Sequence, residues 1–141
     1  MQSNQFWLSP AVHPVYARLV YAELLRQGLS SEQIQADSPL DWDALLHSNH
    51  FLNMSSLQSL LASAIRLSGC PWLGFAVGMH TDVSAHGPAG YAAVTANTIG
   101  EAIGLTEHYS SLRQHLGAFR WERKQPPVLV LDESRTPAAI R

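Results

Sequence analysis

Apolar residues recur at spacings of three and four along most of the chain, which is typical of helices that bury one face. The first helix is predicted to begin after Ser9-Pro10 or at Pro14 and to run to Gln27. Gly28 is suited to the left-handed conformation that ends a helix. Ser30 and Gln33 have the spacing of a capping box, so a short helix is expected to follow. Another short helix is expected over residues 41–46, with acidic side chains near the positive end of its dipole.

The middle of the chain repeats this pattern in shorter stretches. A leucine-rich helix is predicted to have Ser55 or Ser56 as its cap and to end at Gly69. Its predicted apolar face consists of Leu57, Leu60, Leu61, Ala64 and Leu67 or Ser68. The segments predicted after it are a helix over 72–79, a polar loop over 81–86 and a helix over 89–96.

The clearest helical signal covers residues 98–116. Thr98 and Glu101 have capping-box spacing, and Gly117 follows the last apolar position. The apolar positions of this stretch are Ala102, Leu105, Tyr109, Leu112 and Leu116. We expect this stripe to be buried, either against the chain's own hairpin or against a second subunit.

The period changes after Gly117. Phe119 and Trp121 alternate with charged residues, which indicates a strand with one buried face. Residues 124–127 contain two prolines and are expected to be a connection, and the apolar residues 128–131 form a second strand. The sequence therefore predicts an α+β, mostly helical fold, in which several short helices precede a C-terminal β-hairpin.

The last residues have the pattern of a helix start without a helix body. Thr136 is placed as a cap and Pro137 as the first helical residue, but the chain stops at Arg141. We therefore expect the fold to be truncated at its C-terminus, with residues 1–141 forming a single domain of a longer polypeptide.

Composition and charge narrow the class of protein. The 141 residues suffice for one core, and 46% hydrophobic residues are too many for a disordered chain. The formal net charge is −2, whereas domains that bind DNA or RNA by themselves are usually basic. No apolar run approaches the roughly 20 residues that cross a bilayer, residues 1–10 lack the pattern of a secretion signal, and Cys70 is the single cysteine. These features predict a soluble cytoplasmic protein.

Several short motifs follow one another in a distinctive order. They are Leu73-Gly74, Gly78, His-Gly-Pro-Ala-Gly-Tyr at 86–91, Thr-Ile-Gly-Glu-Ala at 98–102, and Tyr109. In this combination and spacing, the chain from about residue 17 to residue 131 resembles the N-terminal effector-binding (arabinose-binding-like) domain of AraC-type transcription regulators.

The resemblance implies a cytoplasmic regulator whose N-terminal domain senses a small-molecule effector and often forms a homodimer. Such regulators bind DNA through a C-terminal domain with two helix-turn-helix units. Nothing in residues 1–141 resembles that domain. The resemblance therefore implies that DNA contacts belong to a part outside this chain.

No pattern of catalytic or metal-binding residues stands out. His108 and His115 are two helical turns apart, about 10 Å, which is too far for one ion without further ligands. Cys70 precedes a proline without an acid–base motif, and neither a nucleophile elbow nor a phosphate loop is present. We therefore expect no enzyme activity, no metal and no cofactor.

The segment at 86–91 has two interpretations. Gly87 permits a tight entry into a helix, and Gly90 would let a backbone or a ligand approach that helix closely. His86 either satisfies backbone donors or presents a ring nitrogen to a ligand. The two glycines thus serve either helix packing or the wall of a pocket, and the sequence leaves both open.

Six side chains are candidates for effector binding. They are His86, Tyr91, Trp72, Phe75, Tyr109 and Trp121. The aromatic ones lie on predicted apolar faces, where packing in the core is the default and the lining of a mostly apolar cavity is the functional alternative. Effector sensing is the leading function, a dimerisation module without a ligand is the second, and a small histidine-dependent enzyme has the least support.

Overall fold

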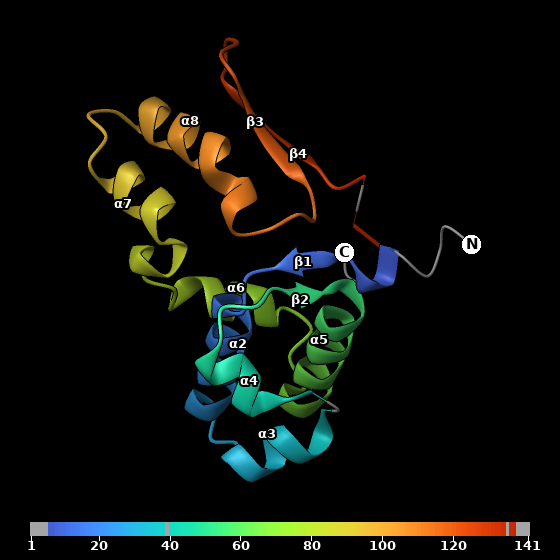
Figure 1. Ribbon diagram of the computed structural model, residues 1–141. Coiled ribbons are helices and arrows are strands. Elements are labelled where there is room, and N and C mark those ends of the chain that lie inside the picture. Colours follow the sequence, from blue (N-terminus) through green and yellow to red (C-terminus); the bar gives the residue numbers. More distant parts are fainter. Residues whose placement is uncertain (1–5, 39, 135, 138–141) are drawn as a thin grey trace. The chain divides into compact units, whose positions relative to one another are not determined.

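The computed structural model describes residues 6–38, 40–134 and 136–137. Its residues group into two compact units, Met1–Thr81 (unit 1) and Asp82–Arg141 (unit 2) (Figure 1). The described residues of each unit form short helices and a two-stranded antiparallel sheet. The predicted class, α+β and mostly helical with a β-hairpin near the C-terminus, is confirmed.

Unit 1 is built from helices and one small sheet. Its elements are β1 (Pro10–Val12), α2 (Val15–Arg26), α3 (Ser31–Asp37), α4 (Trp42–His47), β2 (Leu52–Asn53), α5 (Met54–Ser68) and α6 (Leu73–Met79). Strands β1 and β2 pair antiparallel. The sequence pattern did not predict this pair, because strands of three and two residues are too short to show an alternation.

Most helix ends in unit 1 follow the predicted capping chemistry. Ser30 and Gln33 form the expected capping box at the start of α3, and the Asp41 carboxylate caps α4. Gly28 and Gly69 have positive φ angles of 92° and 61°, as expected for residues that end helices. These ends were predictable because each depends on residues only a few positions apart.

Helix α5 begins earlier than predicted. Its cap is Asn53 rather than Ser55 or Ser56, and the Asn53 side chain accepts a hydrogen bond from the Ser56 N–H at 2.8 Å. Asparagine is at least as good a cap as serine. The earlier start places Met54 in the first turn, where it is buried.

An apolar core fills unit 1. Helices α2 and α5 pack against each other, and α3 and β1 pack against α5. The buried apolar residues are Ala11, Val12, Ala17, Val20, Leu24, Ile34, Trp42, Leu52, Met54, Leu57, Leu60, Ala64 and Leu73. The predicted buried face of α5 is confirmed at Leu57, Leu60 and Ala64.

Unit 2 consists of short helices followed by the hairpin. Its elements are the 3₁₀ helix η1 (Val83–His86), α7 (Pro88–Val94), α8 (Ile99–Tyr109), the 3₁₀ helix η2 (Ser110–Leu112), β3 (Ala118–Glu122) and β4 (Val128–Asp132). Helix α7 packs against η1 and α8, and α8 packs against β3. The predicted polar loop at 81–86 therefore contains a turn of 3₁₀ helix.

Helix α8 is shorter than the helix predicted over residues 98–116. The Thr98 hydroxyl caps it by accepting a hydrogen bond from the Glu101 N–H at 3.1 Å, but the α-helix ends at Tyr109. The serines that open η2 favour side-chain bonds to nearby backbone over helix continuation. The prediction of one continuous helix over 98–116 is therefore wrong. Leu112 is exposed in η2, so its burial against a second subunit stays a prediction.

The hairpin pairs β3 with β4 in a regular antiparallel register. Phe119 lies opposite Leu131, and Trp121 lies opposite Leu129. Directly opposite residues point to the same face of a sheet. These four side chains therefore form what we call the apolar face of the hairpin, and the predicted alternation in β3 is confirmed.

Buried apolar residues are unequally distributed between the units. Among the described residues of unit 2, Ala89 is the only buried apolar side chain, and no residue of α8 is buried. Its exposed large apolar residues are Tyr91, Val94, Ile99, Leu112, Val128, Leu129 and Leu131. Unit 2 thus has little dry core of its own.

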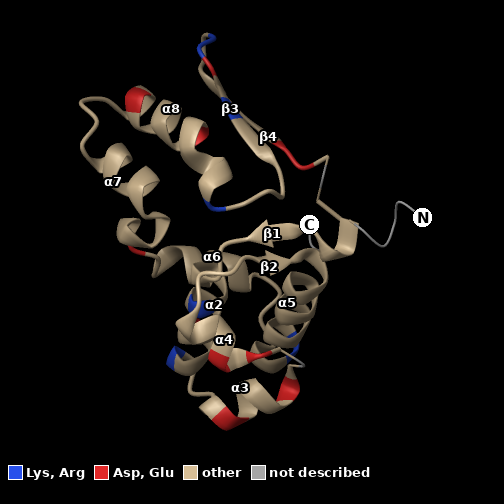
Figure 2. Cartoon of the chain, viewed as in Figure 1, with Lys and Arg blue, Asp and Glu red and all other residues tan. Residues whose placement is uncertain are grey.

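Charged residues are sparse and mixed in sign. Figure 2 shows Lys and Arg at separate points of the elements rather than in a row along one helix. In the described ranges, no single helix is long and apolar enough to cross a membrane. Helices α5 and α6 reach that length and hydropathy only when taken together, and they meet at 93°.

Candidate functional site

The first glycine of the His-Gly-Pro-Ala-Gly-Tyr segment lies where η1 joins α7. Gly87 has φ 59° and ψ −137°, a backbone conformation that residues with a side chain rarely adopt. A Cβ atom at this position would also overlap the guanidinium of Arg113. The Arg113 Nε donates a hydrogen bond to the His86 carbonyl at 3.2 Å, so Arg113 holds the junction between η1 and α7.

The second glycine allows a close approach between elements. Gly90 is buried in α7, where a Cβ atom would overlap the carbonyl oxygen of Val83 and lie 3.1 Å from the His86 Cβ. The approaching group is the backbone of η1. Of the two interpretations of these glycines, the structure supports helix packing.

Two effector candidates flank these glycines. The backbone carbonyl of His86 accepts the hydrogen bond from Arg113. Tyr91 lies on α7, and its side chain is exposed. The expectation that Tyr91 belongs to the core is wrong, because the face of α7 that it occupies is not covered. Contact of either side chain with an effector stays a prediction.

Tyr109 and Trp121 come from α8 and β3, which pack together. The backbone N–H of Trp121 donates a hydrogen bond to the Glu107 carboxylate at 3.0 Å. The ring nitrogen of Trp121 lies 3.8 Å from where a Cβ of Gly100 would be. The Tyr109 ring meets the His108 ring edge-on, with centroids 4.7 Å apart. Trp121 thus connects β3 of the hairpin to α8, and the sequence pattern did not indicate the contribution of Glu107.

The remaining two candidates belong to unit 1. Trp72 directly precedes α6 and Phe75 lies in its first turn, and both are exposed, Phe75 by 81%. Core packing was the wrong expectation for this pair, because Leu73 is the only described residue of α6 that is buried. Of the six candidates, four therefore belong to unit 2 and two belong to unit 1.

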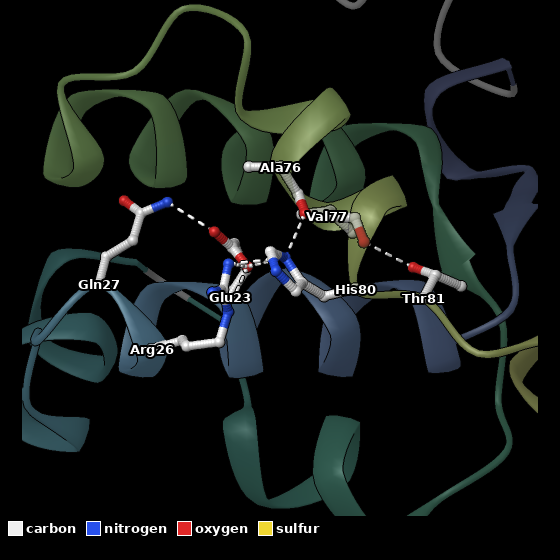
Figure 3. A network of polar contacts seen from close by, with 7 residues as sticks. All are labelled: Glu23, Arg26, Gln27, Ala76, Val77, His80 and Thr81. Carbon is white, nitrogen blue, oxygen red and sulfur yellow. Dashed lines mark hydrogen bonds and ion pairs between the residues drawn. The ribbon is translucent and has the colours of Figure 1, made fainter.

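A polar network that the sequence analysis did not predict lies in unit 1 (Figure 3). Its centre is Glu23 of α2, which is only 3% exposed. The Glu23 carboxylate accepts hydrogen bonds from Arg26 at 2.6 Å and from Gln27 at 2.8 Å. The His80 Nδ1 lies 3.3 Å from the same carboxylate.

His80 connects this network to α6. Its Nδ1 is 2.8 Å from the carbonyl oxygen of Ala76, and the neighbouring Thr81 hydroxyl donates to the Val77 carbonyl at 2.7 Å. The network therefore ties the C-terminal end of α6 to α2. The spacing of Glu23, Arg26 and Gln27 along one helix is the only sequence signal for it.

The network also changes the acidity of its central residue. The Arg26 guanidinium, followed by the Gln27 amide, lowers the pKa of the Glu23 carboxyl from its ordinary value of 4.5, although burial alone would raise that pKa. The carboxylate is thus charged and fully hydrogen-bonded in a buried position. Such an arrangement stabilises a helix contact, and no feature of it indicates catalysis.

A shallow cavity of about 280 Å³ lies in unit 2, beside η2 and the base of the hairpin. Its lining consists of Ser110, Ser111, Gln114, His115, Gly117, Ala118, Asp132 and Ser134. The Gln114 side chain lines this cavity and is held in place by three hydrogen bonds. It accepts from the N–H groups of Leu116 and Gly117 and donates to the Gly117 carbonyl. None of the six effector candidates lines this cavity.

The described residues contain no group of three or more His, Cys, Asp or Glu side chains placed to hold a metal ion. His108 lies in α8 but His115 lies beyond η2, so the two histidines do not share one helix. Cys70 is half-buried and has a free thiol.

Comparison with known proteins agrees with the motif order in the sequence. Residues 28–141 match the protein family described as the arabinose-binding domain of AraC transcription regulators, N-terminal. No curated protein and no solved structure matches the chain. The family match includes most of unit 1 and all of unit 2. The chain therefore belongs to the family of N-terminal arabinose-binding domains of AraC transcription regulators.

Proposed function

We propose that this chain is the effector-sensing and dimerising domain of a cytoplasmic transcription regulator. The observation that carries the proposal is the family match over residues 28–141, which extends through both units. The domain binds a small molecule, forms a homodimer and acts on DNA through a part outside these residues. An effector that binds one arrangement of the domain more tightly shifts the population toward it and thereby biases the DNA-binding part.

The packing of unit 2 supports this function. Seven of its large apolar residues are exposed, so a ligand or a partner that covers them gains hydrophobic free energy. His86, Tyr91, Tyr109 and Trp121 all lie in this unit, and we propose them as its effector contacts. Trp72 and Phe75 are proposed as a separate contact surface on α6.

A dimerisation module without a ligand is the second candidate. The exposed Leu129 and Leu131 of β4 favour it, because exposed apolar side chains on a sheet edge suit contact with another chain. The two candidates differ in their response to small molecules, since only a sensor is stabilised by one.

Thermal unfolding with added ligands tests the proposal. The probes are L-arabinose first, then other pentoses, amino acids and carboxylic acids, each at increasing concentration. Binding at about 100 times the dissociation constant adds roughly 2.7 kcal/mol to the unfolding free energy, which raises the melting temperature by several degrees. We expect at least one probe to do this in a saturable way.

Two variants locate the effect. Tyr91→Ala is expected to weaken the ligand-induced rise, while Ile65→Ala, which removes an exposed apolar side chain from α5 in unit 1, leaves it unchanged. A melting temperature that no probe raises would contradict effector sensing and favour the dimerisation module.

A further inference from the structure

The apolar face of the hairpin is covered on one strand and open on the other. Phe119 and Trp121 of β3 are half-buried, and β3 packs against α8. Their cross-strand partners Leu131 and Leu129 on β4 are 65% and 54% exposed. The uncovered part of this face therefore runs along β4, which is an edge strand in the described sheet.

One hydrogen bond shows which backbone groups point outward from β4. In antiparallel pairs, residues that exchange both backbone hydrogen bonds alternate with residues whose N–H and C=O groups point away from each other. The backbone N–H of Trp121 donates to the Glu107 carboxylate and therefore points away from β4. Trp121 and Leu129 thus form a pair that exchanges no backbone hydrogen bonds. Two positions along, the Phe119–Leu131 pair is of the same kind. Leu129 and Leu131 thus direct their N–H and C=O groups to the free edge.

We infer that a second copy of this chain occupies this edge, with the two β4 strands pairing antiparallel about a two-fold axis at Val130. In this register Leu129 of one copy lies opposite Leu131 of the other, and their outward backbone groups form four hydrogen bonds in all. The two hairpins then form one four-stranded sheet. Its shared face carries both sets of Phe119, Trp121, Leu129 and Leu131.

The residue pattern of β4 fits pairing with itself. The leucines meet each other on the apolar face, Val130 meets its own copy at the axis, and Val128 lies opposite Asp132. No like charges are placed opposite one another across the new seam, where they would be destabilising. A pattern that is apolar on either side of a central residue is self-complementary, as a two-fold interface requires.

This inference rests on the proposed self-association and names the surface that carries it. One strand pair buries less area than the roughly 800 Å² per partner of a standard interface. The dimer is therefore expected to be weak and to depend on protein concentration.

Disulfide trapping tests the register. In a Cys70→Ser background, Val130→Cys places the two thiols on residues whose Cα atoms are about 4.5 Å apart across the axis, within the range of a disulfide. Val128→Cys is the matched control, because its two copies are offset by about 13 Å along the seam. Mild oxidation is expected to give a covalent dimer with Val130→Cys and not with Val128→Cys. No dimer at 130, or equal dimer at 128, overturns the inference.

Sedimentation equilibrium of the full chain gives an independent measurement. Leu131→Lys is expected to raise the dissociation constant of the dimer at least tenfold, because a charge on the free edge opposes strand pairing. Val94→Lys adds the same charge at an exposed apolar position of α7 and is expected to leave the constant unchanged. A Leu131→Lys variant that dimerises like the parent overturns the inference but leaves self-association standing. A parent that stays monomeric removes both, whereas effector sensing is tested separately by the ligand-induced rise in melting temperature.

Discussion

At the scale of single residues, the two glycines at 87 and 90 are explained by what lies beside them. The sequence indicated that position 90 tolerates a close approach, but it did not identify the approaching group. That group is the carbonyl of Val83, in a stretch predicted to be a polar loop. A glycine in the sequence can therefore indicate that a group lies close to it, but only the fold shows which group that is.

Gly90→Ala is expected to lower the unfolding free energy by about 1–3 kcal/mol, because the new Cβ overlaps a backbone oxygen that cannot rotate away. Gly104→Ala is the matched control, since it lies in α8 with nothing within 4 Å of the new atom. The control is expected to stabilise by up to roughly 1 kcal/mol through helix propensity. Urea unfolding of both variants measures this difference, and stabilisation by Gly90→Ala would show that position 90 is not closely packed.

Glu23 predicts a dependence of stability on pH. Its pKa is lower in the folded state than the ordinary 4.5, so its contribution is fully present above that value and is lost as pH falls through the folded-state pKa. Glu23→Gln is expected to cost about 1–3 kcal/mol at neutral pH and to flatten the loss of stability below pH 4.5.

The control for Glu23 is Glu32→Gln, which removes a carboxylate from an exposed position of α3. We expect this control to change the neutral-pH stability by less than about 0.5 kcal/mol. Urea unfolding measured from pH 3 to pH 7 compares the variants, and identical pH profiles for Glu23→Gln and the parent would mean that the network contributes nothing to stability.

At the scale of elements, the sequence predicted what depends on neighbouring residues. The capping box at Ser30, the ends at Gly28 and Gly69, and the alternation in β3 all follow from local patterns. The pairing of β1 with β2 was missed because strands of three and two residues are too short to show an alternation. The length of α8 was missed because the apolar spacing continues past the serines at which the α-helix ends. Local sequence patterns also did not predict that the six effector candidates belong to two different units.

Gln114 is expected to control the turn from η2 into β3. Gln114→Ala removes three hydrogen bonds to the backbone of Leu116 and Gly117 and is expected to destabilise the fold by about 1–3 kcal/mol. Gln114→Glu keeps both accepted bonds and loses only the donated one, so its cost is expected to be smaller. Thermal melts rank the two variants. Equal stability of Gln114→Ala and the parent would remove this side chain as the determinant of the turn.

At the scale of the whole molecule, composition predicted a protein of ordinary hydrophobicity but not where the core would form. The apolar residues of α5 and those of β4 look alike in the sequence. The former are buried by helices of unit 1, while β4 has a free edge. That residues 1–141 fold as a single domain stays a prediction.

We expect this chain by itself to bind no duplex DNA selectively. Its net charge is −2 and its basic residues are dispersed, whereas phosphate neutralisation supplies most of the affinity for DNA (Figure 2). Fluorescence anisotropy with its own promoter region at about 0.15 M salt should detect only weak binding that further salt abolishes. A sequence-selective complex that resists salt would place DNA recognition inside these residues.

The scarcity of dry core in unit 2 has a consequence for the lifetime of the protein. A segment with few buried apolar contacts opens at a lower free-energy cost than the rest of a molecule, and proteases cleave opened segments. A bound effector or a second copy that favours the ordered form reduces this opening in proportion to its occupancy. Unit 1 has its own core, so it opens at a higher free-energy cost and depends less on such protection. We therefore expect the abundance of the protein in a cell to rise with the concentration of the effector or second copy that covers unit 2. Protein without a bound effector or partner is expected to be degraded faster.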